Sequence, residues 1–311
     1  MKKSALMAII CLLSFAFAQA GQFQHSGPED LSITGEPPML GVHWARGSKP
    51  NAHVPEAKGG GGGQKNESPL MTYHGGKILP EVFTESIFWG TGWQSYDGDK
   101  ITGMDTWYQS FGNSDYAKTS DEYTGSNGQV GPIVTHLGHV IDNTPSRGGS
   151  RTSVILAAVC RNVPNPDSSG NGYYAVYTDT PRGHATYCAW HSYGNCGGTP
   201  VQFAFFFDLD GDAGCDPQDT SGLHSQGLAA IANVSGHELS EARTDPASPG
   251  AWYDASGEEN GDKCAWTFNV PLVTFSEGSQ WKIQGEWSNA AYNAGTGYPN
   301  SSGQKGCLDG H

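Results

Sequence analysis

The first 20 residues constrain the fold of this chain most, because they predict export into an oxidising compartment. Two lysines precede an apolar run over residues 5–18, and Ala18-Gln19-Ala20 has the small-x-small pattern of a signal-peptidase site. Six of the seven cysteines lie beyond this segment. An even number of cysteines in an exported chain predicts disulfides, although several pairings are open. The six are Cys160, Cys188, Cys196, Cys215, Cys264 and Cys307.

Charge and hydropathy narrow the class of partner. The formal net charge is −14 at pH 7, which disfavours nucleic acids and anionic membrane surfaces. No segment after the signal approaches the roughly 18 apolar residues of a spanning helix. We therefore expect a secreted protein, extracellular or periplasmic, that is a monomer without membrane insertion.

Two parts follow the predicted signal peptide of residues 1–20. Residues 21–68 are poor in apolar side chains and include five consecutive glycines, which is typical of a flexible leader or linker. Residues 69–311 alternate short β-rich runs with Gly, Asn, Asp and Pro, and their number suits one domain.

We expect this domain to be α+β, with a mixed sheet backed by helices and a zincin-like active-site helix. Buried strands are predicted over residues 82–89, 153–160, 173–177 and 201–207, and helices over residues 99–111 and 227–243. Brief strand runs in 266–275 and 280–287 predict a loop-rich closing layer.

The predicted helix over residues 227–243 contains Gly-His-Glu-Leu-Ser-Glu. His237 and Glu241 are four residues apart and so share a helix face, and Glu238 follows the histidine. In zinc peptidases, residues at this spacing bind the metal and the glutamate after the histidine activates water. A carboxylate in place of the second histidine suits Mn²⁺ or Ca²⁺ as well as Zn²⁺. The alternative is an ordinary polar helix face.

The third metal ligand is open at the level of sequence. Asp245 lies on the same helix face, and the acidic segment over residues 254–262 follows it. Within that segment Glu259 and Asp262 are the favoured candidates. His191 is a further candidate, or a hydrogen-bonded core residue.

A second acidic cluster follows the predicted strand over residues 201–207. Asp208, Asp210 and Asp212 stand at alternate positions and predict either an irregular Ca²⁺ site or a solvated acidic loop. Ala213 occupies the place where an EF-hand loop requires glycine, which argues against that motif.

Several pieces between residue 69 and the C-terminus resemble the phosphate-induced protein or EXORDIUM family, whose plant members are secreted, cell-wall-associated growth proteins. The similar pieces include MTYHGGKILPEVFTESIFWGTGW, SVILAAVC, VQFAFFFD, GLAAIANVSGHELSEARTDP and AWYDASGEENGDKCAW. The His-Glu pair is absent from the plant members, so this chain resembles the bacterial-type relatives. Their His-Glu-x-x-Glu followed by Thr-Asp-Pro is similar to the motif of zincin metallopeptidases.

These observations predict a secreted metal-dependent hydrolase whose substrate is a protein or peptide. His237, Glu241 and a third ligand would hold Zn²⁺ or another divalent ion, and Glu238 would act as the base. The alternative, implied by the resemblance, is a non-catalytic cell-wall or cell-surface protein that binds polysaccharide. Aromatic side chains such as Trp281 and Trp287 would then stack on sugar rings.

Overall fold

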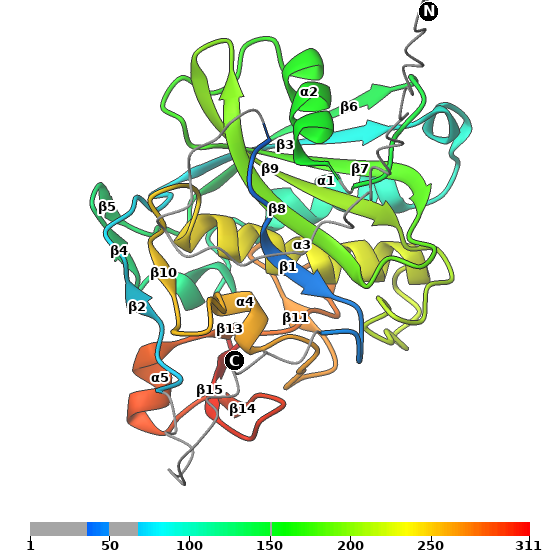
Figure 1. Ribbon diagram of the computed structural model, residues 1–311. Coiled ribbons are helices and arrows are strands. Elements are labelled where there is room, and N and C mark those ends of the chain that lie inside the picture. The colour runs from blue at the N-terminus through cyan, green and yellow to red at the C-terminus, as the bar shows by residue number, and fades with distance from the viewer. Residues whose placement is uncertain (1–35, 50–67, 150) are drawn as a thin grey trace, which may run out of the picture.

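A computed structural model describes residues 36–49, 68–149 and 151–311. The predicted signal peptide and most of the predicted leader lie outside these ranges. A six-stranded mixed sheet lies at the centre (Figure 1). Its strands, in spatial order, are β1 (Leu40–Trp44), β8 (Tyr187–Cys196), β9 (Thr199–Asp208), β7 (Gly172–Pro181), β3 (Val82–Trp89) and β6 (Val134–Asp142).

Parallel and antiparallel pairs both occur in this sheet, which confirms the predicted mixed α+β class. β3 pairs in parallel with β6 and β7, and β7 pairs in parallel with β9. β8 runs antiparallel to β9 on one side and to β1 on the other. β7 and β9 are central and almost continuously buried, as expected for strands with both faces covered.

Helices cover both faces of the sheet (Figure 1). Helix α2 (Thr152–Asn162) packs on one face, and α1 (Lys100–Phe111) and α3 (Gln226–Thr244) pack on the other. The Ser225 hydroxyl caps α3 by accepting from the backbone N–H of Leu228. Pro246 follows the last turn, where the residue before a proline is pushed out of the helical conformation.

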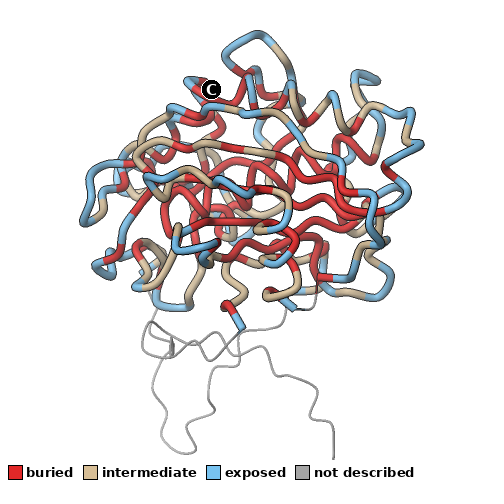
Figure 2. Tube along the Cα trace, turned by 90° about the horizontal axis from the view of Figure 1, so that it is seen from above, coloured by how far each residue is buried: buried red, intermediate tan, exposed pale blue. Residues whose placement is uncertain are grey.

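Helix α3 is buried along almost its whole length because a C-terminal layer covers the side that faces away from the sheet. Figure 2 shows buried segments running through the middle of the molecule, with exposed segments around them. The C-terminal elements are β10 (Trp252–Tyr253), α4 (Asn260–Lys263), β11 (Val273–Thr274), β12 (Gln280–Trp281), β13 (Glu286–Trp287), α5 (Asn289–Ala294), β14 (Tyr298–Pro299) and β15 (Lys305–Leu308). The other short elements of the described residues are β2 (Thr72–Tyr73), η1 (Thr91–Ser95), η2 (Ala117–Ser120), β4 (Thr124–Gly125) and β5 (Gly128–Gln129).

Two predictions about local structure are wrong. Residues 153–160 were expected as a strand but belong to α2, where Ile155, Ala158 and Val159 form one buried helical face. A short apolar run fits either structure until its packing is known. The predicted flexible leader is also wrong for residues 40–44, which form strand β1. Within β1, Gly41 and His43 are buried against the domain.

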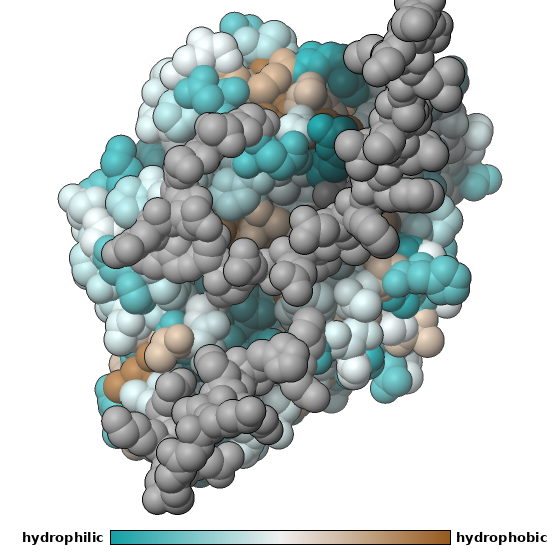
Figure 3. All heavy atoms as spheres, viewed as in Figure 1, coloured by the Kyte–Doolittle hydropathy of each residue, from teal (hydrophilic) through white to brown (hydrophobic). Residues whose placement is uncertain are grey.

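Three disulfides join segments that are distant in sequence. The pairs are Cys160–Cys196, Cys188–Cys215 and Cys264–Cys307. They are consistent with folding in an oxidising compartment. Within the described residues, no helix is long and apolar enough to cross a membrane. The face seen in Figure 3 carries mostly hydrophilic side chains with small hydrophobic areas.

Candidate metal centre

Helix α3 places the motif residues in the interior. His237, Glu238 and Glu241 are fully buried between the sheet and the C-terminal layer. The predicted spacing holds, because His237 Nε2 lies 3.1 Å from Glu241 Oε1. A solvated polar helix face is therefore excluded for these three side chains.

Two residues from other elements reach the same place. His191 of β8 points its Nε2 at Glu259 Oε2, 3.3 Å away, and lies 3.8 Å from Glu241 Oε2. Glu259 is the N-cap residue of α4. Two overlapping groups result, and each could hold a metal ion: His191, Glu241 and Glu259, and His237, Glu238 and Glu241. We refer to these five residues as the metal centre.

The short helix α4 explains the different positions of the two favoured third ligands. The Glu259 side chain accepts from the backbone N–H of Asp262, and the Asp262 side chain accepts from the backbone N–H of Glu259, which makes a capping box. The Asp262 backbone N–H also donates to Glu241 Oε1 at 3.0 Å. Glu259 thus belongs to the metal centre, whereas Asp262 orients α4 and Glu241 from outside it.

Asp245 lies outside the metal centre as well. It is the C-cap residue of α3, and its carboxylate accepts from the backbone N–H of Ala251. Burial, and then the proximity of Glu241, raises its pKa to about 7, although the Ala251 bond opposes this rise. Asp245 therefore braces the chain that leaves α3.

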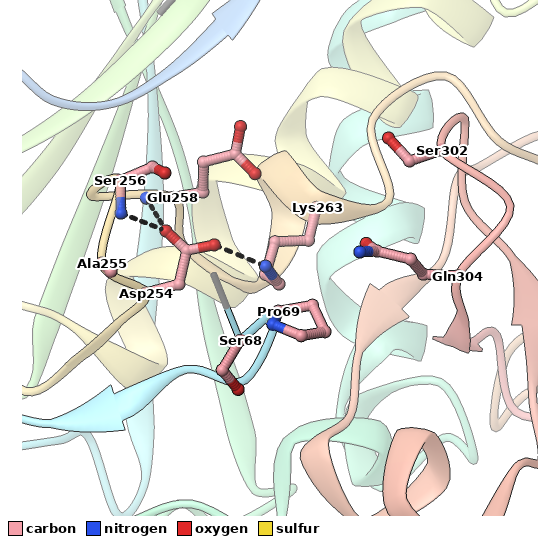
Figure 4. A pocket seen from close by; sticks show the side chains of 9 residues that line it. All are labelled: Ser68, Pro69, Asp254, Ala255, Ser256, Glu258, Lys263, Ser302 and Gln304. Atoms are coloured by element: carbon pink, nitrogen blue, oxygen red, sulfur yellow. Dashed lines mark hydrogen bonds and ion pairs between the residues drawn. The ribbon is translucent and has the colours of Figure 1, made fainter. Parts of the chain in front are cut away.

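Asp254, another acidic residue of the same segment, is held in a local turn. Its carboxylate accepts from Lys263 Nζ at 2.6 Å and from the backbone N–H groups of Ser256 and Glu258 (Figure 4). This carboxylate is already paired with a lysine. It belongs to neither group of the metal centre.

Sequence reasoning missed two side chains that surround His237. Gln284 donates to His237 Nδ1 at 3.1 Å and to the Gly261 carbonyl at 2.9 Å, and it accepts from the backbone N–H of Trp266. His43 of β1 lies 3.1 Å from Gln284 Oε1 and packs its ring 4.2 Å from that of His237. No motif surrounds Gln284 in the sequence, and His43 fell in the predicted leader.

Two carboxylates of the metal centre, those of Glu238 and Glu259, form no ion pair with a lysine or arginine among the described residues. Burial raises the pKa of Glu238 well above its ordinary value, and nearby Glu241 raises it further. Neither oxygen of Glu238 has a hydrogen-bond partner among the described residues, although the His43 backbone lies close enough to lower its pKa slightly. Burial and Glu241 raise the pKa of Glu259 in the same way. A divalent cation would offset this cost, because buried charges are stable only when they are paired.

The histidines have the opposite response to burial. Burial lowers the pKa of His191 to about 3 and that of His237 to about 4, and the charge of Asp262 opposes this lowering at His237. Both imidazoles are therefore neutral at physiological pH. Neutral imidazole is the form that binds metal ions.

The calcium prediction is not supported by the side-chain contacts. Lys100 Nζ lies 2.8 Å from Asp208 Oδ1 and 2.8 Å from Asp210 Oδ2. Arg182 Nε lies 2.7 Å from Asp212 Oδ2. Each of the three aspartates is paired with a basic side chain, so the cluster already has its cations.

Compared with known proteins, the chain matches no family model, no curated protein and no solved structure. The similarity of its sequence pieces to the EXORDIUM family remains a prediction. Any functional assignment depends on the geometry and charge of the metal centre.

Proposed function

We propose that this chain is a secreted metal-dependent hydrolase that cleaves peptide bonds, with the ion bound beside Glu241. The observation that carries the proposal is the convergence of two imidazoles and three carboxylates from β8, α3 and α4 in one buried place. Acidic side chains that are buried as carboxylates in a protein interior require a counter-charge to offset the cost of burial. Disulfides are consistent with the predicted export.

In this proposal, His237 and Glu241 of α3 hold the ion, and His191 or Glu259 of the second group, which also contains Glu241, would complete the ligand set. The donor set of nitrogen and carboxylate oxygen suits Zn²⁺, and also Mn²⁺. A bound divalent ion would polarise the carbonyl of the scissile bond and make water a stronger nucleophile. The Asp262 backbone N–H orients Glu241 through its hydrogen bond, and Gln284 fixes the position of the His237 ring. Because Gln284 donates to Nδ1, binding of the ion by Nε2 would require the Gln284 amide to turn and accept from Nδ1–H.

Glu238 is the proposed general base. It follows His237 on α3, belongs to the same group as His237 and Glu241, and has oxygens without hydrogen-bond partners among the described residues. It would take a proton from the attacking water and pass it to the leaving amine. The positive ion would lower the pKa of Glu238, so that its carboxylate is ionised when the centre is loaded.

A second candidate is a non-catalytic protein with a metal that stabilises the fold. The observation that favours it is closure, because no residue of the metal centre is more than 3% exposed. Structural metal sites are closed, whereas catalytic sites keep an open position. The alternative that the protein binds polysaccharide has less support, because Trp281 and Trp287 are buried and present no face to a sugar ring.

The substitution Glu238→Gln separates the two candidates. In the hydrolase, it should leave one equivalent of Zn²⁺ bound and lower the rate of peptide cleavage by about 10²–10⁴-fold. Mass spectrometry measures the metal content, and a long incubation with a peptide library measures cleavage. Cleavage that is unchanged in this variant contradicts the proposal, as does a chain that binds no ion. A bound ion that raises the melting temperature without any cleavage supports the second candidate.

A further inference from the structure

Strand β1 lies directly over the metal centre. It is an edge strand that pairs antiparallel with β8, and it packs against both α3 and α4. Leu40 stands opposite His191 in the register, and His43 stands opposite Ala189. Figure 1 shows β1 passing in front of α3 and ending beside α4. An N-terminal segment thus covers the residues that would bind the ion.

The approach of β1 to the metal centre is closest at Gly41. This residue has φ of +32°, and a Cβ added to it would lie 2.0 Å from Glu241 Oε2 and 2.4 Å from His191 Cδ2. No side chain fits there. His43, two residues further and on the same side of the strand, packs on His237. The backbone of β1 therefore contacts the carboxylate that the two candidate groups share.

We propose that β1 occupies the place of an extended peptide substrate and keeps the metal centre closed until β1 leaves. This inference rests on the proposed hydrolase function. An extended chain binds the edge of a sheet by main-chain hydrogen bonds, in the antiparallel sense that β1 uses on β8. A peptide that replaced β1 would pass beside His191 and Glu241. The substrate class is accordingly an unfolded or extended polypeptide with a small residue at the position of Gly41.

Hydrogen bonds, ion pairs and packing hold β1 in place, without a disulfide among the described residues. All six cysteines beyond the predicted signal peptide lie after residue 159, so no disulfide within the domain holds residues 36–49. The pairing with β8 is interrupted by register shifts on both sides of Val42 and His43. Glu36 anchors one end by accepting from the backbone N–H of Ser153 at 2.9 Å. Lys49 anchors the other end through an ion pair with Glu258.

The substitution Gly41→Ala in the full chain tests this inference. Its Cβ would overlap Glu241 and His191, so β1 should detach from the metal centre. Gly47→Ala is the matched control, because Gly47 also has a positive φ, of +70°, but nothing lies within 4 Å of its added Cβ. We expect Gly41→Ala to take up Zn²⁺, and to lose it to EDTA, about tenfold faster or more, because the open state becomes the major one. Gly47→Ala should exchange metal at the rate of the unsubstituted chain.

A binding measurement tests the peptide part of the inference without any need for activity. A fluorescent peptide with the sequence PMLGVHWAR, residues 38–46, should bind Gly41→Ala and leave the unsubstituted chain unlabelled. A scrambled peptide of the same composition is the control. Equal metal exchange in both glycine variants, or no preference for the β1 peptide, overturns the proposal. Faster exchange and selective peptide binding without cleavage would uphold the place of β1 while contradicting the hydrolase function.

A second variant covers the case in which Gly41→Ala does not fold. Glu36→Ala removes the anchor at the start of α2, away from the metal centre. It should accelerate metal exchange in the same direction by a smaller factor. Unchanged exchange in a folded Glu36→Ala variant would count against release of β1.

Discussion

Glu241 connects the two candidate groups because its two carboxylate oxygens face different histidines. Oε1 lies 3.1 Å from His237 Nε2 and Oε2 lies 3.8 Å from His191 Nε2. The Asp262 backbone N–H fixes the orientation of Oε1. Glu259 completes the side that belongs to His191. At the scale of residues, the centre therefore depends on two glutamates that come from different elements.

A pair of glutamate substitutions allows a direct test of this arrangement. Glu259→Gln should weaken Zn²⁺ binding by more than the ~10- to 100-fold typical of losing an outer-shell partner, because a buried carboxylate ligand is removed. Glu277→Gln is the matched control, since Glu277 is exposed and belongs to neither candidate group. Isothermal titration of the metal-free proteins measures both affinities. Equal affinities would contradict the assignment of Glu259 to the centre.

Strand β8 is fastened at two points on either side of His191. Cys188 is joined to Cys215 in the chain after β9, and Cys196 is joined to Cys160 of α2. The buried helix α3 packs against the face of β8 that carries His191. At the scale of elements, the two disulfides hold β8, and with it His191, in place over α3.

Removal of the buried disulfide by Cys188→Ala with Cys215→Ala should destabilise the protein. The cysteines are 27 residues apart, and cross-linking a loop of that size in the unfolded chain contributes about 3.5 kcal/mol to stability. Chemical denaturation of the oxidised parent and the double variant, both free of metal, measures the difference. The same midpoint and slope in both would show that this cross-link does not stabilise the fold.

Several buried acids of the folded chain have raised pKa values, so the stability of the whole molecule should depend on pH and on metal. Asp245 has a pKa raised to about 7, and Glu238 and Glu259 have pKa values raised well above normal. The folded chain then binds protons that the unfolded chain has already lost. Stability contributed by these groups falls as pH rises towards and through their folded pKa values.

The histidines have the opposite sign and define the best pH range for a test. His191 and His237 have folded pKa values of about 3 and about 4, so their contribution increases from pH 4 to about 6.5 and is then constant. Above about pH 6.5 only the acids should act. We expect the melting temperature of the metal-free protein to fall between about pH 6.5 and 8. Zn²⁺ should remove this decline, because the ion replaces the protons. A flat profile without metal would contradict the buried acid cluster.

Local patterns in the sequence were sufficient for part of this architecture. The spacing of His237, Glu238 and Glu241 on one helix follows from the helical period, and the structure confirms the helix. The strands expected over residues 82–89 and 201–207 are confirmed, and β9 together with the second half of β3 is buried on both faces. The strand predicted over residues 153–160 is wrong, since their apolar pattern fits a helix equally well and they form part of α2.

The sequence by itself determined the mixed α+β class and the motif helix, because both depend on periods that repeat over a few residues. Only the tertiary structure decided the pairing of the cysteines and the partners of α3. His43, His191, Glu259 and Gln284 are distant from one another in the chain, and they meet because β1 and β8 form one edge of the sheet above α3 while α4 folds back beneath it. Such contacts follow from the order of strands and the packing of layers, which no local pattern specifies.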